Sequence, residues 1–130
     1  MSVAAPLIAI LDDEPEMRKA LRRLLTCRGF RVEEYDCGED LLAALDSRLV
    51  DFLLLDLHMP GLNGFDVLEV FHSRQIPVPV IVITAHDEPG TRERVQALGA
   101  SAYLKKPVDR DALLAALAGA QQPLPSPLTP

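Results

Sequence analysis

The sequence predicts an α/β domain built on a doubly wound, five-stranded parallel sheet with helices on both faces. Short apolar runs alternate along the chain with segments of helical periodicity, and charged or turn residues follow each run. Apolar runs of this length suit strands that are buried on both faces, as in a parallel sheet. Strands that alternate with helices call for right-handed crossovers, which place helices on both sides.

The first strand is predicted at Leu7–Leu11, and it ends in the acidic run Asp12–Glu14. Pro15 suits the first turn of a helix, because the N–H that it lacks would have no helical partner there. Apolar residues then recur along one helical face. These residues are Met17, Ala20, Leu21, Leu24 and Leu25. Gly29 is expected to stop this helix.

The second strand is predicted at residues 31–35, and its polar character places it at a sheet edge. The helix that follows has an apolar stripe made of Leu41, Leu42 and Leu45. The third strand runs from Asp51 to Asp56 and is wholly apolar over residues 52–55. A carboxylate at the carboxyl end of such a buried strand lies where open α/β sheets place their ligand crevice.

Asn63 is expected to cap the next helix, which follows the turn Met59–Gly61. Its apolar stripe consists of Phe65, Leu68 and Phe71. The fourth strand, residues 79–83, is apolar throughout and ends at Thr84. The segment after Pro89 has few apolar residues before Gly99, so it is expected to form the least firmly packed helix.

A brief fifth strand is predicted at residues 102–104, and Asp109 can cap a last helix. The apolar face of that helix includes Leu113, Leu114 and Leu117. Because the first, third and fourth strands are the most apolar, the flavodoxin-like strand order 2-1-3-4-5 is expected. We expect one domain over residues 1–120, followed by a proline-rich tail or linker over residues 121–130.

Composition excludes several classes of function. The formal net charge is −6, which argues against direct binding of nucleic acid or of an anionic membrane. No apolar run approaches the roughly 18 residues of a membrane span. The two cysteines, Cys27 and Cys37, match no zinc motif and make no disulfide scaffold. A cytoplasmic protein with reduced thiols is therefore expected.

The predicted fold brings functional groups to one edge of the sheet, because the carboxyl ends of parallel strands meet there. The group comprises Asp12, Asp13, Asp56, Thr84 and Lys106. Three crowded carboxylates stay ionised only if a cation offsets them, and Mg²⁺ is the hard cation that suits oxygen ligands. A lysine and a hydroxyl beside it suit a phosphoryl group, and an aspartate can form an acyl phosphate. Each residue alone also suits a helix terminus or a turn; their joint placement favours a site.

These motifs resemble those of the receiver domains of two-component response regulators, a CheY-like family that includes the receiver half of FixJ-like regulators. The matching text is DDE at residues 12–14, D-x-x-M-P-G at 56–61, T-A at 84–85 and Y-x-x-K-P at 103–107. The resemblance covers about residues 6–119, with the motifs in the family's order.

The resemblance implies that Asp56 accepts a phosphoryl group from a histidine kinase or a phosphotransfer protein. Asp12, Asp13 and Asp56 would hold Mg²⁺ together with the backbone carbonyl of His58. Lys106, rather than Lys105, would pair with the phosphoryl group. It also implies a cis peptide bond between Lys106 and Pro107.

The resemblance further implies a switch. Thr84 would move toward the phosphoryl group, and Tyr103 would swing inward. This motion would alter the face made by the helix after Pro89, the strand at 102–104 and the last helix. That face would control an output domain or a partner, and a homodimer through it is an expectation of the same kind. The domain would catalyse its own phosphorylation and dephosphorylation without being a metabolic enzyme.

Two histidines and several alternatives remain open at the level of sequence. His58 and His86 would flank the phosphoryl group and tune its lifetime, or they are merely exposed turn residues. A phosphorylation-independent interaction module is the alternative function. An aspartyl-phosphate phosphatase is disfavoured because His58 stands where a second acid is needed, and a flavin protein is disfavoured by the acidic loop after the first strand. The tail favours a receiver that precedes an output domain over a stand-alone receiver.

Overall fold

A computed structural model describes residues 5–120 and confirms the predicted parallel sheet, with strand order β2-β1-β3-β4-β5. The strands are β1 (Leu7–Leu11), β2 (Arg31–Tyr35), β3 (Phe52–Asp56), β4 (Val80–Thr84) and β5 (Ala102–Lys105). The helices are α1 (Pro15–Thr26), α2 (Gly38–Leu45), α3 (Gly64–Ser73), α4 (Thr91–Ala97) and α5 (Arg110–Ala120). The predicted tail over residues 121–130 lies outside the described residues.

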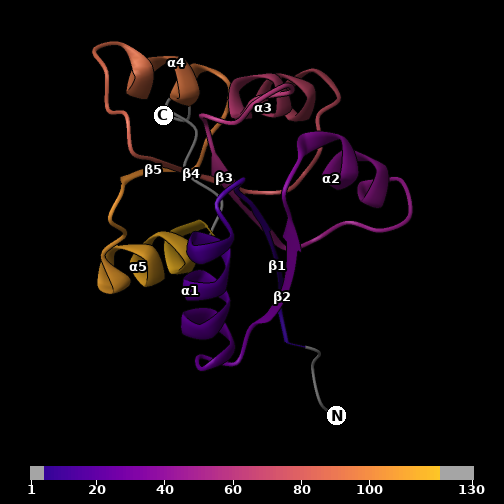
Figure 1. The fold of residues 1–130 in the computed structure, drawn as a ribbon. Helices are drawn as coiled ribbons and strands as arrows, with labels where there is room; N and C mark the ends of the chain where they lie inside the picture. Colours follow the sequence, from indigo (N-terminus) through magenta and orange to yellow (C-terminus); the bar gives the residue numbers. More distant parts are fainter. Residues whose placement is uncertain (1–4, 121–130) are drawn as a thin grey trace, which may run out of the picture.

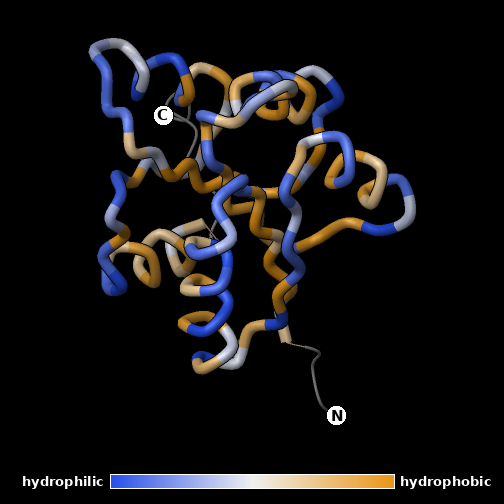
Figure 2. Tube along the Cα trace, viewed as in Figure 1, coloured by the Kyte–Doolittle hydropathy of each residue, from blue (hydrophilic) through white to orange (hydrophobic). Residues whose placement is uncertain are grey.

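The sheet separates two layers of helices: α1 and α5 cover one face, and α2, α3 and α4 cover the other (Figure 1). Strand β1 shows the alternation that builds both cores. Leu7, Ala9 and Leu11 pack on the side of α2, α3 and α4, whereas Ile8 and Ile10 pack on the side of α1 and α5. Hydrophobic residues accordingly concentrate along the central strands (Figure 2).

The edge position of β2 and the weak packing of α4 agree with the sequence. Strand β2 has no buried residue, whereas β1, β3 and β4 are buried throughout. Helix α4 buries only Val95, whereas α3 buries four residues. Within residues 5–120, none of the helices has the length and apolar character that crossing a membrane requires.

Two helix termini confirm the predictions made from the sequence. Asn63 is the N-cap of α3, as the sequence predicted, and the structure shows that it forms a capping box with Asp66. The last regular residue of helix α1 is Thr26, and the predicted stop at Gly29 is confirmed by the hydrogen bonds that follow it. Gly29 has φ +88° and lies in a Schellman turn: its N–H donates to the Thr26 carbonyl at 3.1 Å, and the Phe30 N–H donates to the Leu25 carbonyl at 3.1 Å. Gly29 therefore terminates α1 in its left-handed conformation, as the sequence predicted.

Candidate functional site

The structure brings the predicted acidic residues together at the carboxyl edge of the sheet. Asp56 is the last residue of β3, and Asp12 and Asp13 follow β1 directly. Carboxylate oxygens of these three residues all lie within 4.8 Å of one another. Asp12 is 3% exposed and Asp56 is 4% exposed, so two of the three charges are shielded from water.

Lys106 supplies the positive charge of the site. Its Nζ lies 2.9 Å from Asp12 Oδ2, 3.0 Å from Glu14 Oε1 and 3.6 Å from Asp56 Oδ1. Its backbone N–H donates to the Thr84 carbonyl at 2.8 Å, which ties the loop after β5 to the end of β4. The Lys106–Pro107 peptide bond is cis.

The neighbouring Lys105 points to a different acid. Its Nζ lies 3.5 Å from Asp87 Oδ2, and both side chains are solvent-exposed. The structure therefore places Lys106, and not Lys105, beside the acidic group.

The acidic residues at this edge of the sheet carry more negative charge than Lys106 neutralises. Burial, followed by the charge of Asp12, raises the pKa of Asp56 to about 6, although the charge of Lys106 lowers it in part. Burial lowers the pKa of Lys106, but hydrogen bonds with Asp12 and Glu14 raise it, and the net direction is upward. One ammonium thus faces the carboxylates of Asp12, Glu14 and Asp56.

The donor set fits a hard divalent cation. The three clustered carboxylates offer only oxygen ligands, and they carry more negative charge than Lys106 can offset. Mg²⁺ prefers oxygen ligands and takes one or two carboxylates together with water and phosphate oxygens. The residues that are present therefore fit the cation that the resemblance implied.

Gly64 is a residue of the site that the sequence reading did not identify. A Cβ atom at this position would lie 2.3 Å from the carbonyl oxygen of Asp56 and 2.6 Å from Leu57 Cα. The Gly64 N–H also donates to the Leu57 carbonyl at 3.1 Å. The start of α3 therefore packs directly on the backbone that carries Asp56, and only glycine allows this approach. The signal in the sequence was the Asn63-Gly64 pair.

Thr84 and Tyr103 are both engaged with the loop between β4 and α4. The buried Thr84 Oγ1 accepts a hydrogen bond from the His86 N–H at 3.0 Å. The Tyr103 hydroxyl donates to Asp87 Oδ1 at 2.8 Å, and the residue is buried. Burial, followed by Asp87, raises the pKa of Tyr103 to about 12, so the hydroxyl stays protonated. No pattern in the sequence marked Asp87 as the partner of Tyr103.

His58 and His86 contact each other at the rim of the site. Both side chains are exposed, yet their ring centroids lie 4.5 Å apart in an edge-to-face arrangement with an interplanar angle of 74°. His58 also lies 6.4 Å from the Phe65 ring, measured between centroids. The two histidines thus form one aromatic contact between the loops after β3 and β4. Their effect on the lifetime of a phosphoryl group remains a prediction.

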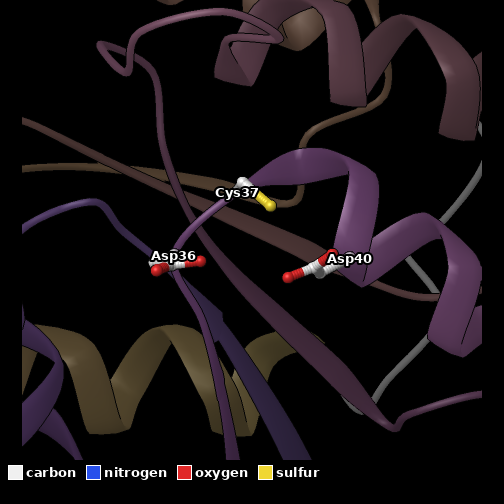
Figure 3. A group of neighbouring side chains, drawn as sticks. All are labelled: Asp36, Cys37 and Asp40. Atoms are coloured by element: carbon white, nitrogen blue, oxygen red, sulfur yellow. The ribbon is translucent and has the colours of Figure 1, made fainter.

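A second group of potential metal ligands lies at the start of α2, and it consists of Asp36, Cys37 and Asp40 (Figure 3). The carboxylates of Asp36 and Asp40 point toward one another, and both residues are exposed. A hydrogen bond with the Asp40 backbone lowers the pKa of the Cys37 thiol, but burial and nearby carboxylates outweigh it and the net direction is upward. Because a metal binds the thiolate, this group is a poor cation site.

Comparisons with known proteins place these residues in a family context. The family described as "Response regulator receiver domain" matches residues 8–118 of the chain. The positive alginate biosynthesis regulatory protein of Pseudomonas aeruginosa is 42% identical over 120 residues, which are 89% of this chain and 47% of that protein. The DNA-binding transcriptional regulator NtrC of Salmonella typhimurium is 35% identical over 109 residues, which are 84% of this chain and 23% of that protein.

Solved structures agree with these relatives. The crystal structure of FixJ-N superposes with a TM-score of 0.83 at 29% identity, covering 97% of this chain and 99% of that one. The matched segments span less than half the length of the two curated relatives, so the similarity concerns only part of each.

Proposed function

Because the chain belongs to the response regulator receiver domain family of two-component systems, we propose that Asp56 accepts a phosphoryl group from a histidine kinase or a phosphotransfer protein. The observation that carries the proposal is the placement of Asp56. Its carboxylate is almost fully buried at a strand end, beside two further carboxylates and the ammonium of Lys106. No structural role requires these charges at one place, because burying them costs free energy.

The reaction is a phosphoryl transfer between two side chains. A carboxylate oxygen of Asp56 bonds to phosphorus as the bond from phosphorus to the donor's imidazole nitrogen breaks. The electron pair of the broken bond stays on that nitrogen, and the product on this chain is an acyl phosphate. Lys106 lies 3.6 Å from Asp56 Oδ1, so its ammonium can pair with a phosphoryl oxygen held there.

The acidic residues complete the binding site for the phosphoryl group. Asp12, Asp13 and Asp56 would hold Mg²⁺ together with the backbone carbonyl of His58, and the cation would supply positive charge against the phosphoryl oxygens. The His58 N–H, 3.5 Å from Asp56 Oδ1, is a further hydrogen-bond donor on the same side of Asp56.

Thr84 and Tyr103 would transmit the change through the loop that they share. For the Thr84 hydroxyl to donate to a phosphoryl oxygen, it must give up its present donation to the His86 carbonyl at 3.4 Å, because it has only one proton. His86 is followed by Asp87, which holds the Tyr103 hydroxyl. A move of Thr84 therefore disturbs the anchor of Tyr103 and biases the position of α4, which buries only one residue.

The altered face, formed by α4, β5 and α5, would act on an output domain or on a second copy of the chain. Both curated relatives described above are named as regulators, and each is more than twice as long as the matched segment. We therefore propose that the domain controls the output of a longer regulator. We also propose a cytoplasmic location, and the free thiols of Cys27 and Cys37 support it because the cytoplasm keeps thiols reduced.

The test is the intact mass of the chain after incubation with acetyl phosphate, with and without Mg²⁺. The wild type should gain one phosphoryl group only in the presence of Mg²⁺, and Asp56→Asn should gain none. A folded wild type that gains no phosphoryl group would refute the proposal and favour a phosphorylation-independent interaction module on the same fold.

A further inference from the structure

Glu14 lies at the edge of the site, and its side chain contacts Lys106 instead of capping a helix. It occupies the N-cap position of α1, where a side chain normally accepts a hydrogen bond from the first turn. Glu14 makes no such bond. Its Oε1 lies 3.0 Å from Lys106 Nζ. The carboxylate that could have capped α1 is thus engaged with the lysine of the site.

The backbone of Glu14 is held on both sides. Pro15 restricts the residue before it to extended conformations, and Glu14 has φ −91° and ψ 111°. Its N–H donates to Asp12 Oδ1 at 2.9 Å, and its carbonyl accepts from the Arg18 N–H at 3.1 Å. Only the side chain of Glu14 is therefore free to leave Lys106.

The partners of Lys106 differ in how readily they are released. A lysine ammonium has three N–H donors, and here three carboxylates surround it. Its contacts with Asp12 and Glu14, at 2.9 and 3.0 Å, are shorter than its contact with Asp56, at 3.6 Å. The Glu14 side chain is 63% exposed and that of Asp12 is 4% exposed. Because water resolvates an exposed carboxylate, Glu14 is the partner that Lys106 exchanges at least cost.

We propose that Glu14 is a positioning residue: it holds the Lys106 ammonium away from Asp56 and releases it when a phosphoryl group arrives. The proposal rests on the proposed function of Asp56. Lys106 must leave one carboxylate before it can donate to the phosphoryl group, so Glu14 slows phosphorylation. Its removal should speed phosphorylation roughly two- to five-fold, the range of a partly exposed ion pair.

The first experiment compares phosphorylation rates by acetyl phosphate with Mg²⁺, followed by intact mass. Glu14→Gln keeps the shape of the side chain and removes its charge. Glu16→Gln is the matched control, because it removes the same charge from an exposed residue in the first turn of the same helix. Glu14→Gln should be faster than wild type by the stated factor, and Glu16→Gln should match wild type. Equal rates for Glu14→Gln and wild type would overturn the proposal.

A second comparison separates the release of Lys106 from general repulsion of the anionic donor. In a Lys106→Met background, Glu14→Gln should leave the rate unchanged, since there is no ammonium to release. If the acceleration persists in that background, Glu14 acts on the donor and the proposal is wrong. Folding of each variant is checked by circular dichroism.

A third readout is independent of the reaction. Without a phosphoryl donor, Glu14→Gln should shift the ¹⁵N ammonium signal of Lys106, and Glu16→Gln should not. An unchanged signal in Glu14→Gln would mean that the ion pair does not form in solution. A wild type that gains no phosphoryl group would refute the function proposed for Asp56, whereas a phosphorylated wild type as fast as Glu14→Gln would refute only the role of Glu14.

Discussion

Replacing Asp56 by asparagine should stabilise the protein at neutral pH when no divalent cation is present. Burial, together with the charge of Asp12, raises the pKa of Asp56 from 3.8 to about 6. The folded state therefore binds a proton more tightly than the unfolded chain does. The stabilisation that this proton provides is complete below pH 3.8 and is lost as the pH rises through about 6. Above that pH, the folded protein carries an ionised carboxylate in an unfavourable place.

The size of the expected gain in the free energy of unfolding follows from the shift in the pKa of Asp56. A rise from 3.8 to about 6 is roughly two pKa units, and each unit corresponds to about 1.4 kcal/mol. Ionised Asp56 therefore costs the folded state up to about 3 kcal/mol, which the neutral amide of asparagine does not. Asp56→Asn should raise the free energy of unfolding by up to this amount at pH 8. The gain should shrink toward zero at pH 4, where the wild-type carboxyl group is already protonated.

Urea unfolding, followed by circular dichroism in EDTA at pH 4, 6 and 8, measures this gain. Asp111→Asn is the matched control, because its side chain is exposed and its replacement should change stability by less than about 0.5 kcal/mol. A gain that stays constant from pH 4 to pH 8, or an Asp56→Asn protein less stable than wild type at pH 8, would refute the electrostatic reasoning.

Three further predictions concern the same site. Adding Mg²⁺ at pH 8 should raise the urea midpoint of wild type and should raise that of Asp56→Asn much less, since one ligand is lost; equal responses would argue against this cation site. Gly64→Ala should lower the free energy of unfolding by about 1–3 kcal/mol, because the new Cβ would meet the Asp56 backbone. Gly119→Ala is the control: its Cβ would lie in open space, so in the same urea assay it should be neutral or stabilise the protein by up to about 1 kcal/mol. Asn63→Ala removes the capping box of α3 and should cost about 0.5–2 kcal/mol by thermal or urea unfolding; no loss would show that the cap is redundant.

The sequence by itself determined the fold class, and it predicted which acidic residues lie with Lys106 at the carboxyl edge of the sheet. Periodicity identified the strands and helices, and the differences from the structure are short shifts at element ends. The fourth strand is one case: it was predicted at residues 79–83 and runs over Val80–Thr84, because apolar spacing locates the buried run while pairing with β3 and β5 sets its ends. The acidic residues and Lys106 could be grouped in advance because parallel strands deliver their carboxyl ends to one edge.

Only the tertiary structure decided which groups within the site contact one another. Asp87 as the partner of Tyr103, and Glu14 as a partner of Lys106, depend on side chains from separate loops meeting in space. The need for Gly64 depends on how closely α3 approaches the backbone of Asp56. The spacing of apolar residues in the sequence shows the period of each helix or strand, but it does not show how far apart these elements lie in the fold. The raised pKa of Asp56 is decided in the same way, because burial is a property of the assembled fold.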